Sequence, residues 1–170
     1  MEEFVILVDE NDAEIGKAKK LEAHQKGLLH RAFSIFIFNS SGEMLLQQRA
    51  LGKYHSGGLW TNACCGHPRP GETILNAAKR RLMEEMGITC ELESKYAFTY
   101  KANLDNNLIE HEVDHVLIGK FDGEFLFNSA EVSNFKWMGI EELKDDIAKS
   151  PQDFTVWFRM SLEEILAIYP

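Results

Sequence analysis

Residues 61–88 constrain the chain more than any other stretch, and they read TNACCGHPRPGETILNAAKRRLMEEMGI. A cysteine, a histidine and glycines come first, in a segment typical of a loop. The next part predicts a helix over 72–86, because apolar residues recur on one face and Gly87 follows as a C-terminal cap. A loop that leads into a helix presents backbone N–H groups and carboxylates together, which suits a divalent cation bridging to a diphosphate.

The spacing within this stretch is a second constraint. Gly66 is followed after five residues by Glu72, and after seven more by the run Arg80-Arg81-Leu82-Met83-Glu84-Glu85-Met86-Gly87-Ile88. This pattern resembles the Nudix box, Gly-x5-Glu-x7-Arg-Glu-(apolar)-x-Glu-Glu-x-Gly-(apolar), at every defining position except one, where Arg81 replaces a glutamate. The alternative is an ordinary amphipathic helix with arginine–glutamate pairs at i,i+4 spacing, although the matching glycine spacing argues against it.

The length, net charge and cysteine content of the chain limit which kinds of protein it can be. We expect a single Nudix-like domain over residues 1–170, since this length is typical of one domain. The net charge of −9 argues against a nucleic-acid or membrane-surface partner, although a local basic pocket can still hold a phosphorylated substrate. No apolar run approaches the roughly 20 residues of a membrane helix, and the acidic N-terminus is unlike a secretory signal. Three cysteines, two of them adjacent, make a poor disulfide framework, so a cytoplasmic location is expected.

Hydrophobic patterns predict a mixed order of strands and helices. Strands are expected over 4–8, 30–39, 43–48, 59–65, 91–102, 108–121 and 135–138, with a hairpin turn at 105–107. Residues 30–39, HRAFSIFIFN, are apolar at nearly every position, which predicts a strand covered on both faces. One or two helical turns are expected within 17–27, and helices over 140–149 and 154–168. The fold class is therefore α/β (α+β), with α/β/α layers.

Three histidines and two carboxylates form a candidate metal site. His24 and His30 lie before and at the start of the long apolar strand, and His67 lies in the box loop. Glu110 and Glu112 are two residues apart on a predicted strand, so both point to one face, where burial is costly unless a cation holds them. Such a set suits Mn, Fe, Zn or Mg, and the imidazoles favour a transition metal.

Structural explanations compete with this interpretation. Taken singly, each of these five side chains is more often structural or exposed. The remaining histidines, His55, His111 and His115, belong to no motif and are interpreted as structural or surface residues. His111 alternates to the face opposite its two glutamate neighbours.

A cysteine and a basic set complete the candidate chemistry. Cys65 directly precedes the Gly-His-Pro of the loop, and a thiol near a metal or basic groups can act as an acid or a base. Cys64 and Cys90 are expected to be small buried hydrophobes. Basic side chains near metal ligands in an acidic protein suggest an anion clamp, although each alone is typical of a solvated surface. The clamp residues are Lys20, Arg49, Lys53 and Arg81.

Taken together, these features resemble the type I isopentenyl-diphosphate isomerases of the Nudix superfamily. The resemblance rests on the arginine inside the box, the NACCGHP segment, the HRAFSIFIFN strand and the Glu110-His111-Glu112 pattern, and it covers about Lys20 to Trp157. It implies an α/β/α sandwich with a central mixed sheet. It also implies interconversion of isopentenyl and dimethylallyl diphosphate in isoprenoid biosynthesis, by a metal-dependent 1,3-allylic proton shift. The expected partner is this small diphosphate, and the expected state is a monomer or weak homodimer.

The resemblance also implies a role for each candidate residue. A divalent ion (Mn²⁺, Zn²⁺ or Mg²⁺) is held by His24, His30, His67, Glu110 and Glu112. A second ion, Mg²⁺, is held with the substrate diphosphate by Glu85 and the main-chain carbonyl of Cys65. The diphosphate is bound by Lys20, Arg49, Lys53 and Arg81. The catalytic pair is Cys65 and Glu112, with Tyr100 hydrogen-bonded to the glutamate and Trp157 placed against the hydrocarbon.

The chemistry requires an acid on one side of the alkene and a base on the other. Our hypothesis is that Glu112, helped by Tyr100, protonates the alkene while Cys65 takes the allylic proton, with the roles reversed in the reverse reaction. A C-terminal helix carrying Phe154, Trp157 and Phe158 is interpreted as a lid that excludes water.

Two rival functions share most of these features. The first is a Nudix hydrolase of a nucleoside diphosphate derivative. Arg81 argues against it, because a cation in place of the glutamate of the box weakens metal binding. The second is a non-catalytic metal- or nucleotide-binding module. The complete set of Cys65, Glu112, Tyr100 and Trp157 argues against it, since binding alone does not require that set.

Overall fold

The structure is a computed structural model that describes residues 3–168. Its strands are β1 (Phe4–Val8), β2 (Glu14–Lys19), β3 (His30–Phe38), β4 (Met44–Arg49), β5 (Trp60–Thr61), β6 (Cys64–Gly66), β7 (Leu92–Asn103), β8 (Ile109–Lys120) and β9 (Val132–Met138). Its helices are α1 (Lys20–Lys26), α2 (Ile74–Met86), α3 (Ile140–Lys149) and α4 (Val156–Ile168), with short 3₁₀ turns at Asp105–Asn107 and Pro151–Asp153. None of the helices within residues 3–168 has the length and hydropathy needed to cross a membrane.

Strand β3 is the centre of the sheet. It runs parallel to β8 over its whole length, with His30 opposite Glu112 and Phe38 opposite Lys120. On its other side it pairs antiparallel with β6, with Ser34 opposite Cys65. β7 and β8 form the expected antiparallel hairpin, and β9 pairs with β4. The sheet is therefore mixed, as expected, because it combines parallel and antiparallel pairs.

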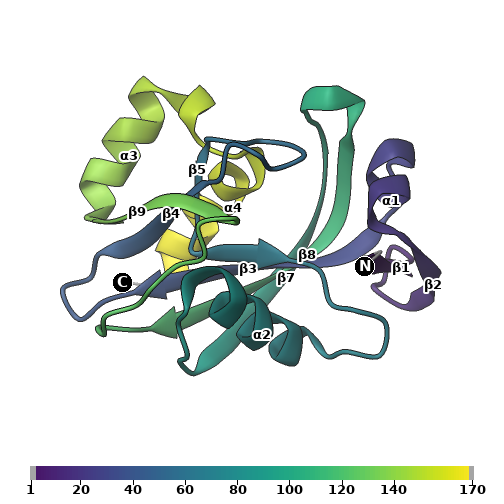
Figure 1. The fold of residues 1–170 in the computed structure, drawn as a ribbon, viewed down its shortest axis with the longest axis horizontal. Coiled ribbons are helices and arrows are strands. Elements are labelled where there is room, and N and C mark those ends of the chain that lie inside the picture. Colours follow the sequence, from purple (N-terminus) through teal and green to yellow (C-terminus); the bar gives the residue numbers. More distant parts are fainter. Residues whose placement is uncertain (1–2, 169–170) are drawn as a thin grey trace.

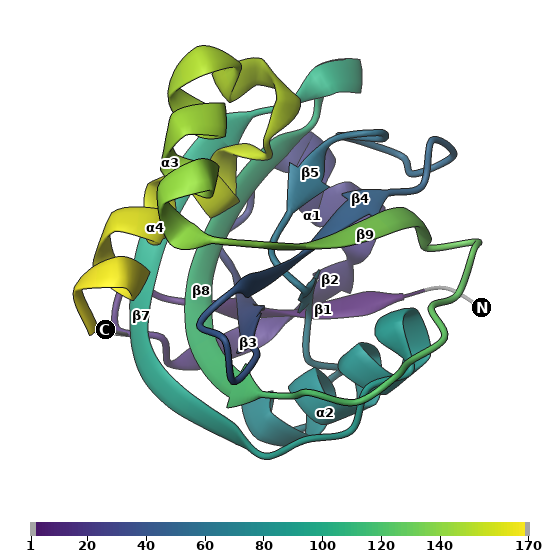
Figure 2. The same ribbon diagram turned by 90° about the vertical axis from the view of Figure 1, so that its left-hand side faces the viewer.

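Two helical layers cover opposite faces of this sheet (Figures 1 and 2). Alternate residues of β3 enter different hydrophobic clusters, as the pleat requires. Phe33 and Ile35 pack in the cluster that contains the buried face of α2. Phe36 and Phe38 pack in the cluster that contains α3 and α4. The apolar run of β3 thus has the predicted cause, a strand buried on both faces, and the predicted α/β/α layers are confirmed.

The observed elements differ from the predicted ones in several details. β4 follows β3 in the chain but pairs with it only between Phe38 and Met44, and otherwise pairs with β9. β2 was not predicted, because its mostly exposed residues carry little hydrophobic signal. The strand expected over 59–65 is divided into β5 and β6. Phe154 and Phe158 are buried in the core under α3, so α4 is part of a packed layer rather than a lid.

Helix α2 begins and ends with specific caps. It starts two residues later than predicted, after Thr73, whose hydroxyl accepts a hydrogen bond from the backbone N–H of Asn76. It ends at Gly87, which has the left-handed φ of 66° and donates its N–H to the carbonyl of Met83. A Cβ on Gly87 would lie 2.5 Å from the carbonyl oxygen of Leu126. The residue must therefore be glycine for two reasons, one conformational and one steric.

We expect Gly87→Ala to lower the free energy of unfolding by roughly 2 kcal/mol or more, from the left-handed φ and the close carbonyl together. Urea denaturation measures this change. Gly52→Ala is the matched control, because a Cβ at Gly52 meets no atom within 4 Å and its φ lies outside the left-handed region. Equal denaturation midpoints for the two variants would contradict this explanation of the helix end.

Candidate active site

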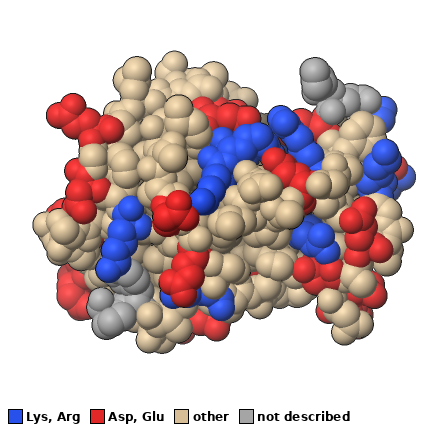
Figure 3. All heavy atoms as spheres, turned by 90° about the horizontal axis from the view of Figure 1, so that it is seen from below, with Lys and Arg blue, Asp and Glu red and all other residues tan. Residues whose placement is uncertain are grey.

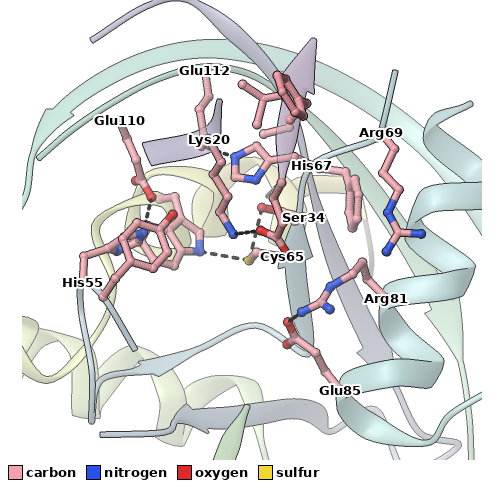
Figure 4. Close-up of a pocket in the computed structure, with 18 of the residues that line it drawn as sticks. Lys20, Ser34, His55, Cys65, His67, Arg69, Arg81, Glu85, Glu110 and Glu112 are labelled. Atoms are coloured by element: carbon pink, nitrogen blue, oxygen red, sulfur yellow. Dashed lines mark hydrogen bonds and ion pairs between the residues drawn. The ribbon is translucent and has the colours of Figure 1, made fainter. Parts of the chain in front are cut away.

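A cavity of about 600 Å³ opens at one end of β3 and β8 (Figure 4). Its wall is made by β6 and the box loop, the face of α2, the loop between β4 and β5, and the start of α4. Every residue that the sequence assigned to substrate binding or catalysis lines it: Lys20, Arg49, Lys53, Cys65, Arg81, Tyr100, Glu112 and Trp157. His24 and His30 lie behind this wall and are fully buried.

Three imidazoles converge on one carboxylate oxygen, Oε1 of Glu112. The Nε2 atom of His67 lies 2.9 Å from it, that of His30 lies 3.3 Å away, and that of His24 lies 3.8 Å away. The Nε2 atoms of His30 and His67 are 3.2 Å apart. These four ligand atoms all lie within 4.8 Å of one another, which is the spacing of a coordination sphere.

Backbone carbonyls fix the orientation of the two buried imidazoles. Nδ1 of His24 lies 2.8 Å from the carbonyl oxygen of Lys20, and Nδ1 of His30 lies 2.8 Å from that of Leu28. Each Nδ1 therefore carries a hydrogen, and each Nε2 faces Glu112. A histidine whose outer nitrogen donates to a carbonyl is typical of a metal ligand.

The donor set fits a divalent transition metal. Burial lowers the pKa of His67 to about 3, so its ring is neutral. Although burial acts to raise the pKa of Glu112, its hydrogen bonds with His30 and His67 hold that pKa well below its ordinary value. Several lone pairs and a carboxylate then face one another with few hydrogens between them, an arrangement that a cation stabilises.

Glu110 lies on the same face of β8 as Glu112, as predicted, and its hydrogen-bond partner is Tyr100. The hydroxyl of Tyr100 lies 2.9 Å from Glu110 and 2.7 Å from Glu112. Burial and the charge of Glu112 raise the pKa of Glu110 well above its ordinary value. A protonated Glu110 can donate to the phenol oxygen, and Tyr100 can then donate its single hydrogen to Glu112.

His55 was interpreted as structural or on the surface, but it is buried in the cavity wall. Its Nε2 atom lies 3.6 Å from Glu110, and its ring stands edge-on to that of Trp157. Burial lowers the pKa of His55 to about 2, so the ring is neutral. With His24 and Glu110 it makes a second group of possible metal ligands. No motif marks this residue, because the loop between β4 and β5 brings it in from elsewhere in the chain.

The thiol of Cys65 is held within hydrogen-bonding distance of several groups. The indole N–H of Trp157 donates to Sγ over 3.0 Å, and the thiol donates to Oδ1 of Asn62 over 3.2 Å. The hydroxyl of Ser34 lies 3.7 Å from Sγ and donates to the buried carboxylate of Asp114. Burial and the negative charge of Asp114 raise the pKa of Cys65 to about 12, so the thiol keeps its hydrogen at neutral pH.

Basic side chains also line the cavity, and three of them pair with carboxylates. Lys20 pairs with Glu3 at 2.8 Å, and Lys53 pairs with Glu131. Arg81 pairs with Glu85 and lies 3.4 Å from Glu131. On the face seen in Figure 3, the largest group of Lys and Arg atoms likewise has Asp and Glu atoms directly beside it. The cations are thus balanced by carboxylates that a bound anion can replace.

The remaining box residues hold the loop in place. Arg80 makes a two-point contact with Glu72, with both N–H···O distances at 2.8 Å. Glu72 also accepts the backbone N–H of Arg69. The Arg69 side chain lines the cavity but was not among the predicted site residues, because it belongs to no motif. The glutamate and arginine of the pattern therefore fix the turn that presents His67 to the cluster.

Known proteins with similar sequences identify the family. Residues 28–158 match the model of the NUDIX domain. An isopentenyl-diphosphate Delta-isomerase of Burkholderia multivorans is 54% identical over 96% of this chain and 93% of its own length. One from Serratia proteamaculans is 53% identical over 97% of this chain and 92% of its own length. The chain belongs to the isopentenyl-diphosphate isomerase family.

Solved structures agree on the fold of this family member. A Deinococcus radiodurans protein is similar with a TM-score of 0.72 at 20% identity, covering 86% of this chain and 90% of its own. A MutT protein of Methanosarcina mazei has a TM-score of 0.65 at 19% identity, covering 80% and 91%. At this identity the likeness concerns the fold alone.

We expect His30→Gln to lower the bound transition metal by at least about tenfold, because it removes a fully buried ligand atom. Inductively coupled plasma mass spectrometry of dialysed protein measures the metal. His115→Gln is the control, because His115 lies on the opposite face of β8, where its Nε2 is 2.8 Å from Asp12. Equal metal content in all three proteins would show that this cluster is not a metal site.

Proposed function

We propose that this chain interconverts isopentenyl diphosphate and dimethylallyl diphosphate by moving one proton onto the alkene and removing another from the allylic carbon. Relatives named for this activity, about half identical over nearly the whole chain, support the proposal. The observation that carries it is that Cys65 and Glu112 line one cavity from different strands. Isomerisation needs two such proton carriers, and hydrolysis of a diphosphate does not.

Each carrier has its own supporting group. Tyr100 donates to Glu112 at 2.7 Å, and Trp157 donates to the sulfur of Cys65 at 3.0 Å. At neutral pH the thiol of Cys65 is protonated, because its pKa is raised, and Glu112 is ionised, because its pKa is lowered. One member of the pair therefore carries a proton and the other can accept one. Each member is the acid in one direction of the reaction and the base in the other.

Burial favours the short-lived cationic intermediate. Tyr100, Glu112 and Trp157 are all at least nine-tenths buried, so few water molecules can reach the reacting carbons. The ring of Trp157 is fixed by its bond to Cys65, and an indole face beside a carbocation contributes on the order of 1–2 kcal/mol. The hydrocarbon end of the substrate therefore lies at the buried end of the cavity, between these groups.

The diphosphate lies at the basic end, where Lys20, Lys53 and Arg81 line the wall. Their carboxylate partners, Glu3 and Glu131, give up these contacts when the substrate binds. We propose that Glu85 holds Mg²⁺ with the diphosphate, as the box position implies, and that Mg²⁺ supplies neutralising charge. A further divalent ion, Mn²⁺, Zn²⁺ or Mg²⁺, would be held by His24, His30, His67, Glu110 and Glu112, and it would supply positive charge beside the two carboxylates.

Arg81 argues against a Nudix hydrolase. Its guanidinium pairs with both Glu84 and Glu85, the carboxylates that the box supplies for metal ions. A cation in place of one carboxylate leaves fewer negative groups for metal and more positive charge for the diphosphate. The helix is therefore suited to holding a diphosphate rather than to breaking it.

Isopentenyl diphosphate incubated with the protein and Mg²⁺ in D₂O is expected to give deuterated dimethylallyl diphosphate, followed by proton NMR. Deuterium enters because the added proton comes from an acid that exchanges with solvent. Release of phosphate or pyrophosphate would instead indicate hydrolysis. No change in the substrate, with metal bound and the fold intact by circular dichroism, would contradict both enzymatic functions.

Cys65→Ala and Glu112→Gln are each expected to lower kcat by at least about a thousandfold, because each removes a proton carrier. Diphosphate binding, measured by calorimetry with a non-isomerising diphosphate, is expected to persist in Cys65→Ala, since the basic residues remain. Cys90→Ala is the control, because Cys90 packs against the core on the α2 side of the sheet. Loss of binding without loss of kcat would show that these residues anchor substrate instead.

A further inference from the structure

The side chain of Asn62 is fully buried and lies directly beside the reactive thiol. Its amide nitrogen donates to two carbonyl oxygens, those of Ile35 and Cys64, both at 3.0 Å. A nitrogen with two acceptors cannot exchange places with the amide oxygen without losing both bonds. The oxygen Oδ1 is therefore fixed on the side of Cys65, where it accepts the S–H over 3.2 Å.

A second set of bonds holds the amide in place. The hydroxyl of Thr61 donates to Oδ1 of Asn62 over 2.9 Å and lies 2.8 Å from the hydroxyl of Thr155. The backbone N–H of Thr155 donates to the carbonyl of Trp60 over 3.0 Å. Thr155 immediately precedes α4, whose first turn carries Trp157. The loop with Cys65 and the helix with Trp157 are thus joined through Asn62 and two buried threonines.

We propose that Asn62 is the positioning residue of the Cys65 thiol, an inference that rests on the proposed function. Its fixed oxygen accepts the S–H, and the indole N–H of Trp157 donates to the same sulfur from another residue. These two bonds together hold Sγ at one position in the cavity wall. Without the amide oxygen, the side chain of Cys65 rotates more freely about Cα–Cβ, and Sγ occupies its reactive position for a smaller fraction of the time.

The geometry predicts an effect on turnover rather than on substrate binding. Asn62 does not line the cavity, whereas every assigned diphosphate contact does. Misplacing a reacting group by about 1 Å costs about a hundredfold in rate. We therefore expect Asn62→Ala to lower kcat by about tenfold to a hundredfold and to change KM by less than about threefold.

Thr61→Val is the matched control. It removes the hydroxyl that bonds Asn62 and Thr155. The amide nitrogen keeps both of its carbonyl acceptors, so the amide oxygen still faces Cys65. A lower melting temperature with a kcat within about threefold of the wild type is expected, because the loss concerns stability. Should Asn62→Ala fail to fold, Asn62→Ser provides the same test, since its hydroxyl is too short to reach the sulfur.

A readout independent of turnover is alkylation of Cys65 by iodoacetamide, resolved by peptide mass spectrometry. Asn62→Ala is expected to change the labelling rate of Cys65 at least about threefold, because the sulfur loses one of the two partners that fix its position, while labelling of Cys90 stays unchanged. Failure of the wild type to isomerise overturns the proposed function, and labelling still tests the positioning of the thiol. Wild-type kcat in Asn62→Ala, or an equal loss of kcat in Thr61→Val, overturns the positioning proposal.

Discussion

The register of β3 against its two neighbours is the constraint on which the active site depends. On one side His30 lies opposite Glu112, and on the other Ser34 lies opposite Cys65. His30 and Ser34 are four residues apart, so they share a face, and each partner points to that same face. A slip of one residue against β8 would turn Glu112 away from the imidazoles and toward the opposite layer. The long apolar strand therefore contributes to the core and also sets the positions of Cys65 and Glu112, the proposed proton carriers.

The same register places the active site on the face covered by α4. Phe36 and Phe38, further along that face of β3, pack under α3 and α4. At the open end of the strand, polar side chains replace the phenylalanines, and Trp157 from the first turn of α4 meets Cys65. The buried phenylalanines fix the helix, and the fixed helix orients the indole. Packing at one end of a strand thus determines hydrogen bonding at the other, because the helix and the strand are both rigid.

The buried ionisable groups of the active site lower the stability of the folded protein. Glu110, Glu112 and Asp114 follow one another on the buried face of β8, and burial raises the pKa of both Glu110 and Asp114. Within residues 3–168, Oδ1 of Asp114 has no hydrogen-bond partner. Three carboxyl groups on one buried face are costly unless protons or cations balance them. A cation held among His24, His30 and His67 would relieve that cost, and its binding would then be coupled to folding of this sheet.

Local sequence patterns predict much of the fold and of the candidate site. The features that they do not predict depend on contacts between residues far apart in the chain. The period of α2, its glycine cap, the double burial of β3 and the shared face of Glu110 and Glu112 all follow from spacing along the chain. His55 and Asn62 did not stand out, because each becomes important only when a loop folds back on a distant strand. The expected lid was wrong because α4 packs one face, with Phe158, Leu162 and Ile165, into the core cluster of this side of the sheet.

Arg81, the arginine inside the box, favours binding of the diphosphate over its hydrolysis. A row of carboxylates at this helix would gather metal ions around the phosphates and favour attack at phosphorus. Arg81 instead pairs with Glu84, Glu85 and Glu131, and it turns positive charge toward the cavity. In the proposed reaction Lys20, Lys53 and Arg81 hold the diphosphate, while Cys65 on β6 and Glu112 on β8 each exchange a proton with the hydrocarbon. Because the proposed binding and proton-transfer residues belong to different elements, the carbon chain could react while the phosphates stay in place.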